Sequence, residues 1–477
     1  MLKINTLRTF FGPVLGARTA LLAATFMLLL GCSPEKAPEK TAGNCAPLPP
    51  LQYSKNLKIG TSCGEQMAEI RSIVGSDTLV KRFVLRPKGS DRGTLPKGLE
   101  GATVLQVPLA RAVALSSAQV GFMTRLGLEN AIVAVGEGKY IADSALYERV
   151  QKGEVAEVGS GPTLSLEKLL ALKPDLVMNF ATGGAYDDYQ RIEALGLPLM
   201  LTSEWQEEHP LAKAEWIKLF GMLLGVDSLA NAVYEQSKAD YLASFNKSGL
   251  EIASPSARND TLSSSNGGVA GVSPARGGSG PSAGSGTFVT EPTKESEGET
   301  SPGNNSEKKL SSLVSRLSSK QCPRVLVGMS YGGVWYAPGG NSYTAQLIRD
   351  AGGRYLWAGT EERELRLPLE QVIALADSAD IWINPGMFST AEEILGAEPR
   401  VARIKAFREK RVFQNDGRKG PGGGNDFYES AVAKPEKMLN DFVWAIGAFK
   451  DSEKADSVKN AAPDGAKSRW YRNIFNF

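Results

Sequence analysis

The chain has 477 residues and a nearly balanced charge, with 54 Lys and Arg against 52 Asp and Glu, so its formal net charge is +2. No basic stripe is interleaved with aromatic residues, so the composition gives no support for nucleic-acid binding. The chain contains a single His, His209, which excludes His-rich metal sites and His-based acid–base catalysis.

Residues 1–31 predict a signal peptide that leads to a lipid-modified cysteine. Three basic residues precede an apolar run at 19–30, which is too short to span a bilayer comfortably. The run ends in Leu-Leu-Gly-Cys, which resembles the lipobox of bacterial lipoproteins. We therefore expect Cys32 to become the first mature residue and to carry a lipid, and we expect residues 32–54 to form a solvated tether. An uncleaved anchor with an incidental Cys is the alternative.

The other cysteines are Cys45, Cys63 and Cys322, and no pair of them has the spacing of metal ligands. A disulfide between Cys45 and Cys63 would contribute about 3 kcal/mol for a loop of that length. Three cysteines cannot all pair, so the sequence leaves this bridge open. Around them, residues 55–103 predict a β-rich extension of short strands, including one at 78–86.

Residues 104–226 predict a first α/β lobe, because short strands alternate with helices of about ten residues. The expected elements are strands at 104–107, 111–115, 131–135 and 199–202, helices at 118–126, 189–195 and 211–224, and a helix followed by a strand at 166–180. This alternation is typical of a parallel sheet.

A single long helix is predicted at 227–248, where apolar residues recur at helical spacing, and it is long enough to join two lobes. Residues 249–307 are rich in Ser, Gly, Pro and acidic residues and predict a disordered insert. A second α/β lobe is expected at 308–450, with a C-terminal tail at 451–477. Its expected elements are helices at 308–317, 344–351, 390–395, 401–407 and 434–449, strands at 323–328 and 411–413, and a helix followed by a strand at 369–384.

The two lobes repeat one pattern about two hundred residues apart. Residues 166–179 and 369–384 each begin with a Glu near the start of an apolar helix, turn at an Asp and end a buried strand in Asn. A helix followed directly by a strand is half of a βαβ unit. The sequence therefore predicts an α/β fold of two lobes with mainly parallel sheets, joined by one long helix, with a ligand cleft between them.

Polar and aromatic residues gather near the expected strand ends in both lobes, where ligands of open α/β sheets bind. For each residue alone, core packing or turn formation is the plainer interpretation. As a group they predict a ligand-binding cleft. The candidates are Ser116, Ser117, Tyr140, Glu204, Trp205, Ser330, Tyr331, Trp335, Tyr336, Asn341, Tyr343, Arg418, Asn425 and Tyr428.

Residues 328–332 spell G-x-S-x-G after a strand, which raises the alternative of a lipid-anchored hydrolase with Ser330 as nucleophile. Such an elbow must lead into a helix, yet residues 333–340 predict a loop. The required His after the Ser is also missing. We therefore predict no catalytic residues, no bound metal and no enzyme activity.

The lipobox, the repeated pattern and the lone helix between two α/β lobes resemble the substrate-binding lipoproteins of ABC importers, specifically the iron–siderophore, haem and vitamin B12 binding proteins. The segments at 162–178, 330–350 and 424–429 are similar to the family's motif and to its second-lobe cleft segments. The resemblance covers 104–449 apart from the insert.

This resemblance implies a monomeric protein at the periplasmic face of a membrane, which delivers a small molecule to an ABC permease and needs no cofactor of its own. It also implies that Glu167 and Glu370 dock onto Arg residues of that permease. The plainer interpretation of both Glu residues is that they complement the helix dipole. Because Arg418 and Lys419 lie near aromatic residues, an anionic ferric siderophore is the expected ligand, with a corrinoid or haem next.

Overall fold

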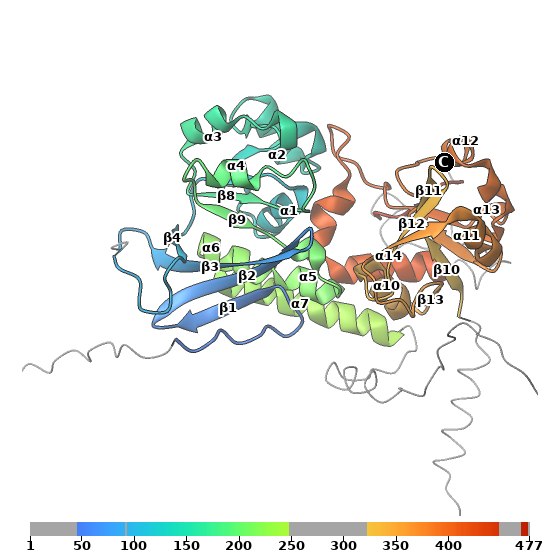
Figure 1. Cartoon of the computed structure of the whole chain (residues 1–477), viewed down its shortest axis with the longest axis horizontal. Coiled ribbons are helices and arrows are strands. Elements are labelled where there is room, and N and C mark those ends of the chain that lie inside the picture. The colour runs from blue at the N-terminus through green and yellow to red at the C-terminus, as the bar shows by residue number, and fades with distance from the viewer. Residues whose placement is uncertain (1–44, 91–92, 248–321, 448–468, 476–477) are drawn as a thin grey trace, which may run out of the picture. The chain divides into compact units, whose positions relative to one another are not determined.

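The computed structural model describes residues 45–90, 93–247, 322–447 and 469–475 (Figure 1). Asn44–Phe477 forms one compact unit. Cys32, the predicted signal peptide, the predicted insert and the helix expected at 308–317 lie outside the described residues. None of the described helices is both long and apolar enough to cross a membrane.

The N-terminal extension forms a four-stranded sheet in the order β1-β2-β3-β4. Its strands are β1 (Leu57–Ser62), β2 (Glu65–Val74), β3 (Asp77–Pro87) and β4 (Thr103–Val107). The first three strands are antiparallel, whereas β4 pairs parallel to β3. This last strand, predicted at 104–107 as part of the first lobe, instead lies at the edge of the extension.

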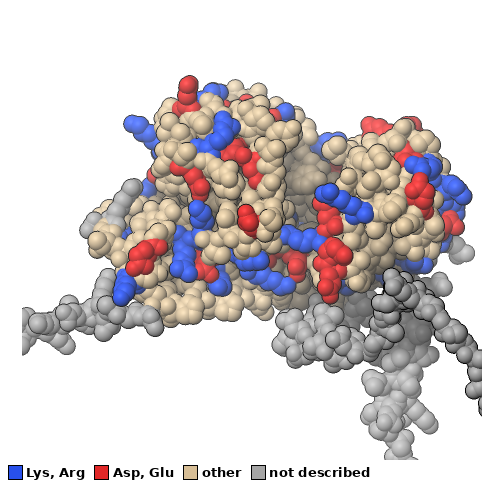
Figure 2. Space-filling model, in the orientation of Figure 1, with Lys and Arg blue, Asp and Glu red and all other residues tan. Residues whose placement is uncertain are grey.

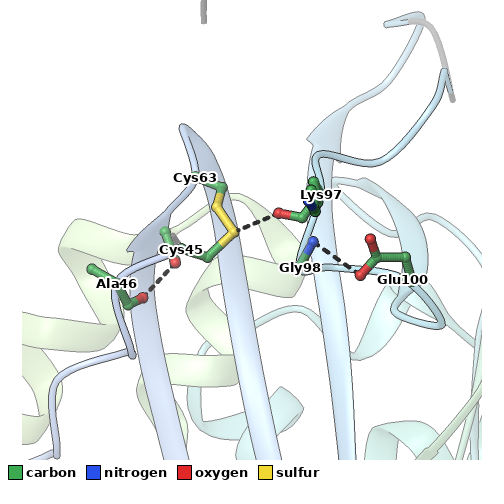
Figure 3. Close-up of a disulfide and its surroundings, with 7 residues drawn as sticks. Cys45, Ala46, Cys63, Lys97, Gly98 and Glu100 are labelled. Atoms are coloured by element: carbon green, nitrogen blue, oxygen red, sulfur yellow. Dashed lines mark hydrogen bonds between the residues drawn. A yellow bond between two sulfur atoms is a disulfide. The ribbon is translucent and has the colours of Figure 1, made fainter. Parts of the chain in front are cut away.

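A disulfide joins Cys45 to Cys63 and ties the segment before β1 to the turn after it (Figure 3). The loop it closes spans 18 residues, for which chain entropy predicts a stabilisation of about 3 kcal/mol. The third described cysteine, Cys322, is free and exposed.

The first lobe contains a fully parallel sheet in the order β7-β6-β5-β8-β9. Its strands are β5 (Ala112–Ala114), β6 (Ile132–Val135), β7 (Ala156–Glu157), β8 (Leu176–Asn179) and β9 (Leu199–Leu201), and its helices are α1 (Ser117–Arg125), α2 (Ser144–Gln151), α3 (Leu166–Leu172) and α4 (Tyr189–Glu193). Because helices connect these parallel strands, the central ones are buried apolar runs.

Two further helices, α5 (Pro210–Glu215) and α6 (Ile217–Leu224), replace the single helix expected at 211–224. The long helix α7 (Asp227–Lys247) follows directly. Tyr234 of α7 belongs to the hydrophobic core of the first lobe, and Tyr241 and Phe245 belong to the core of the second. One helix therefore packs into both cores, which agrees with the fold predicted from the sequence.

The second lobe has a mainly parallel sheet in the order β13-β10-β15-β16-β17. Its strands are β10 (Arg324–Val327), β13 (Arg354–Tyr355), β15 (Ile381–Ile383), β16 (Val412–Gln414) and the antiparallel β17 (Arg472–Asn473), and its helices are α10 (Tyr343–Asp350), α11 (Leu369–Ala376), α12 (Ala391–Ala397), α13 (Lys405–Arg408) and α14 (Pro435–Gly447). The C-terminal segment thus folds back as an edge strand, and Trp470 is buried beneath it.

A small antiparallel sheet follows β10, so the prediction of a loop at 333–340 is wrong. It consists of β11 (Met329–Tyr331), β12 (Val334–Pro338) and β14 (Glu364–Pro368). Ser330 lies inside the β11–β12 hairpin. A nucleophile elbow needs a strand, a sharp turn and a helix, so this hairpin does not provide one.

Candidate functional site

Both parallel sheets reverse their strand order at one point, which is where ligands of open α/β sheets bind. In the first sheet this point lies between β5 and β8, and in the second it lies between β10 and β15. Ser116 and Ser117 directly follow β5, and Ser330 follows β10. The repeated pattern places Asn179 at the end of β8 and Asn384 just after β15.

The side chains at these two points differ in how many hydrogen bonds they already make. Ser116 Oγ accepts the Ala118 N–H at 3.2 Å and caps α1, and Asn179 donates to Asp188. In contrast, Ser330 Oγ and Asn384 Oδ1 are buried without a hydrogen-bond partner among the described residues. Such atoms carry an uncompensated desolvation cost unless a ligand or water meets them.

The loops after the first-lobe strands expose several aromatic side chains. Tyr140 follows β6 and is 53% exposed, and Trp205 follows β9 and is 41% exposed. Phe180 and Tyr186 follow β8 and are also exposed, although they were not among the predicted residues. Phe180 is the last residue of the helix and strand predicted at 166–180 and directly follows β8, so its position could have identified it.

A second aromatic group lies at the strand ends of the other lobe. The ring of Tyr331 stacks on Phe388, 6.0 Å away, and Tyr336 lies 6.1 Å from Tyr331. The Tyr331 hydroxyl accepts the N–H of Met387, whose side chain is 86% exposed. Phe388 and Met387 follow β15 and were missed by the sequence analysis. Together these residues form an apolar surface beside Ser330 and Asn384.

Figure 2 shows a hollow between the two lobes. On the face in view its walls are mainly uncharged, and Lys, Arg, Asp and Glu gather below it.

One of the predicted residues packs into the core, and two others lie around the start of α10. Trp335 is completely buried against Trp382, and its indole N–H donates to the carbonyl of Val327 at 2.9 Å. Asn341 is exposed just before α10, and Tyr343, the first residue of that helix, is half-buried. Burial raises the pKa of Tyr343 above its ordinary value.

Glu204 and Lys213 link the first-lobe strand ends to the second lobe. Burial raises the pKa of Glu204, although the charge of Lys213 opposes this shift, and Glu204 Oε2 has no partner among the described residues. Burial likewise lowers the pKa of Lys213. The Lys213 ammonium lies 4.9 Å from the ring centre of Tyr343. Glu204 is thus a buried carboxyl group directly beside the exposed Trp205.

Residues 418–430 of the second lobe pack directly against the first lobe. A side chain at Gly420 would meet the backbone of Ala142, and one at Gly424 would meet the backbone of Tyr140, which explains why this loop is rich in glycine. Both carboxylate oxygens of Glu429 accept first-lobe N–H groups, from Ala142 at 2.8 Å and Asp143 at 2.7 Å.

The remaining predicted residues lie in or beside this segment. Arg418 pairs with Asp426 at 2.9 Å and lies over the ring of Trp470. Asn425 caps a short 3-10 turn by accepting the N–H of Phe427. Tyr428 is 58% exposed. Arg418 and Asn425 therefore already hold intramolecular partners, whereas the Tyr428 ring is open to solvent.

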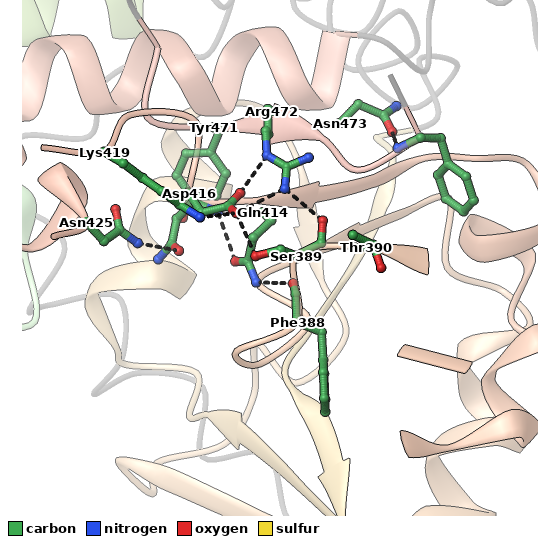
Figure 4. A network of polar contacts seen from close by, with 12 residues as sticks. Phe388, Ser389, Thr390, Gln414, Asp416, Lys419, Asn425, Tyr471, Arg472 and Asn473 are labelled. Atoms are coloured by element: carbon green, nitrogen blue, oxygen red, sulfur yellow. Dashed lines mark hydrogen bonds and ion pairs between the residues drawn. The ribbon is translucent and has the colours of Figure 1, made fainter. Parts of the chain in front are cut away.

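The C-terminal strand fixes the loops that follow β15 and β16. Asp416 accepts hydrogen bonds from Arg472 at 2.7 Å and from Ser389 Oγ at 2.7 Å, and Lys419 lies 3.4 Å away (Figure 4). Gln414 donates to the carbonyl of Phe388. This network holds the loop that carries Phe388 against the loop that leads to Arg418.

The N-terminal extension braces the strand-end loops of the first lobe. Gln206 forms two hydrogen bonds with the backbone of Ile73 in β2. The Gly75 N–H in the β2–β3 turn donates to the carbonyl of Thr182, where a side chain at Gly183 would collide with Gly75. The hairpin therefore holds the loops after β8 and β9, which carry Phe180 and Trp205.

Glu167 and Glu370 occupy matching positions in the first turns of α3 and α11, and both are exposed. Glu370 pairs with Arg400 at 2.8 Å, and Arg400 also bonds Glu398. Glu167 makes no ion pair within the part of the chain that the structure describes. A crossover helix begins beside the carboxyl ends of its parallel strands, so both carboxylates lie at the sheet edge that carries the aromatic residues.

Comparison with known proteins gives one match to a family. A family model described as periplasmic binding protein matches residues 113–247 and 301–418, which is just over half of the chain. The match omits 248–300, which includes most of the insert predicted at 249–307, and it begins after the N-terminal extension. Within the described ranges, no cluster of three or more His, Cys, Asp or Glu residues could hold a metal ion.

Individual relatives are distant. The chain is 18% identical over 390 residues to an uncharacterized lipoprotein of Methanocaldococcus jannaschii, covering 78% of this chain and 75% of that protein. A periplasmic haem-binding protein from Pseudomonas aeruginosa is 17% identical, with a TM-score of 0.43 over 72% of this chain and 94% of that one. The periplasmic vitamin B12 binding protein of Vibrio cholerae is 14% identical, with a TM-score of 0.40 over 72% and 99%.

Proposed function

Because this chain belongs to the periplasmic binding protein family, we propose that it captures a metal chelate in the periplasm and delivers it to the permease of an ABC importer. A ferric siderophore is the first candidate, followed by a corrinoid or haem. Proteins of this family bind their substrates for transport and do not catalyse reactions. We further propose that a lipid on Cys32 anchors the protein to its membrane and that it acts as a monomer.

The observation that carries this proposal is the exposure of aromatic side chains at the strand ends of both parallel sheets. Large exposed apolar groups in one region are characteristic of a ligand or partner surface. Tyr140, Phe180 and Trp205 supply such groups in the first lobe, and Tyr331 and Tyr428 supply them in the second. A bulky chelate with flat, weakly polar faces would cover these rings, whereas a bare metal ion would not.

Unpartnered buried polar atoms in the same region support a ligand with polar groups at its edge. Ser330 Oγ can donate or accept, Asn384 Oδ1 can accept, and Glu204 Oε2 belongs to a carboxyl group whose pKa burial raises. Arg363 lies near the Trp205 ring and adds a cation there. Siderophores, corrinoids and haem all combine a large apolar face with peripheral amide, hydroxyl or carboxylate groups.

The proposal is tested by titrating the purified protein with a ferric catecholate, a ferric hydroxamate, haem and cyanocobalamin while following tryptophan fluorescence. We expect saturable 1:1 binding of one of these chelates. Trp205→Ala and Tyr331→Ala should each weaken that binding about tenfold, because each removes a large contact surface. Leu229→Ala is the control, since this side chain is 47% exposed on α7. Failure of all four chelates to bind would refute the ligand class.

A further inference from the structure

A hollow of about 460 Å³ lies between the lobes and shares only Arg418 with the residues predicted to bind the chelate. Its first-lobe wall consists of parts of α1 and of the start of α2, and its second-lobe wall consists of residues between 418 and 434. The charged side chains on these walls are Arg125, Asp143, Arg418, Lys419, Asp426, Glu429 and Lys434. Four cations therefore face three carboxylates.

The three carboxylates already have partners within the protein. Asp143 caps α2 by accepting the Leu146 N–H at 2.8 Å. Asp426 accepts from Ser430 Oγ and from the Trp470 indole N–H, in addition to its ion pair with Arg418. Glu429 accepts the two first-lobe backbone N–H groups described above. Hydrogen bonds within the protein therefore hold these three carboxylates in the walls.

Two of the cations make no ion pair with a described residue. Arg125 and Lys434 make no ion pair and no side-chain hydrogen bond with any residue that the structure describes. Lys434 is half-buried. Burial lowers its pKa, the charge of Asp426 opposes this shift, and the charges of Arg125, Arg418 and Lys437 add to it. Glu436 is the other nearby carboxyl group, and burial raises its pKa, although the charges of Arg125 and Lys437 oppose that shift.

We propose that this hollow binds a small oxyanion, a phosphate or a carboxylate group, between Arg125 and Lys434. Arg125 and Lys434 lie on walls whose own carboxylates already accept hydrogen bonds within the protein. Oxyanions accept charge-assisted hydrogen bonds from both Arg and Lys. Because one cation belongs to each lobe, the anion bridges the lobes. The site goes beyond the proposed function, since the chelate-binding surface at the strand ends does not require it.

Inorganic phosphate is the probe, added to the full-length protein at low ionic strength and followed by calorimetry and by the melting temperature. We expect 1:1 binding that weakens as chloride rises, because added salt screens the attraction. Lys434→Met and Arg125→Gln should each lower the affinity about tenfold. The matched control is Lys437→Met, which removes an exposed lysine next to the hollow but not on its wall and should change the affinity less than about twofold.

A second readout separates a binding role from a structural one. Without phosphate, Lys434→Met should melt at the same or a higher temperature than the wild type, because it relieves repulsion among neighbouring cations. In phosphate, the wild type alone should gain stability. Absence of phosphate binding to the wild type, or equal binding to Lys434→Met, would overturn the proposal without affecting chelate binding.

Repeating the chelate titration in saturating phosphate shows whether the oxyanion is a free anion or an acidic group of the chelate. If phosphate competes with the chelate, an acidic group of the chelate occupies the hollow. If the two bind independently, the hollow takes a free anion. Either result upholds the site and assigns its occupant.

Discussion

Gln206 binds Ile73 in the way that a neighbouring β-strand would. The Gln206 side-chain oxygen accepts the Ile73 N–H at 2.8 Å, and its amide nitrogen donates to the Ile73 carbonyl at 2.7 Å. One residue of the first lobe thus satisfies both backbone groups of a residue in the N-terminal extension. Gln206 directly follows Trp205, so this pair fixes the loop that exposes the indole.

Gln206→Ala should therefore weaken both the fold and chelate binding. We expect a loss of about 1–2 kcal/mol in the free energy of unfolding and a fall in affinity of about tenfold, because the loop loses its support. Ligand titration and hydrogen exchange of the amides at 203–207 measure the two effects. Gln66→Ala, an exposed glutamine on the same strand β2, is the control. Faster amide exchange at 203–207 with unchanged chelate affinity would show that the Gln206–Ile73 hydrogen bonds do not support ligand binding.

The repeated pattern predicted much of the fold because each copy is one continuous stretch of sequence, whose residues indicate a helix and then a strand. Both copies form a helix followed by a buried strand, and the residues that end them, Asn179 and Asn384, lie at the reversal points of the two sheets. The strand orders that make these positions important depend on pairing between distant segments. That pairing has no local signal, so the sequence located the strand ends without identifying which ones lie together.

Trp335 and Tyr336 show how a local error changes the predicted site. Read as a loop, the segment at 333–340 places both aromatic rings in the cleft. As a strand, its side chains alternate between two faces. Trp335 is therefore buried in the core while Tyr336 remains beside Tyr331. The brace from β2 to Gln206 was also missed, since it joins residues more than one hundred positions apart.

Glu429 should make the stability of the protein depend on pH near neutrality. Burial, assisted by the charges of Asp426 and Asp143, raises the pKa of Glu429 from an ordinary value of 4.5 to about 7, although the N–H groups of Ala142 and Asp143 oppose the shift. The folded protein therefore binds this proton more tightly than the unfolded chain. The associated stability is fully present below pH 4.5 and is lost as the pH rises through about 7.

Glu429→Gln tests this expectation, because Gln keeps an acceptor for one N–H group but does not titrate. The melting temperature should fall less between pH 5 and pH 8 in the variant than in the wild type. Asp441, whose pKa burial raises to about 6, contributes equally to both proteins and cancels in the difference. Parallel pH profiles of the two proteins would contradict the assignment.

Deleting residues 253–306 should leave chelate affinity nearly unchanged, because the composition of this segment offers little apolar surface to bury and the family match omits it as far as residue 300. The deletion is compared with the wild type by ligand titration and by thermal unfolding. A short Gly-Ser linker replaces the segment. A large fall in affinity or in melting temperature would show that the segment is part of the fold.

The last prediction concerns permease docking by Glu167 and Glu370. Both carboxylates are exposed at the starts of equivalent helices. Glu167→Lys and Glu370→Lys should leave chelate affinity within about twofold of the wild type and should weaken uptake by cells. The double variant should abolish uptake, since one charge on each lobe fixes the orientation of the protein on its permease. Loss of chelate binding in either single variant would refute a pure docking role.

The ion pair between Glu370 and Arg400 permits a sharper control. An exposed pair of this kind contributes little to stability, so Arg400→Gln should leave Glu370 freer to meet a cation of the permease. Because Arg400 also bonds Glu398, the melting temperature of the variant is measured beside uptake. Uptake should then be maintained or increased. Glu148→Lys reverses another exposed glutamate that pairs with a neighbouring lysine, and it should not affect uptake. If Glu148→Lys impairs uptake as strongly as Glu370→Lys, the effect is one of net charge and Glu370 has no specific docking role.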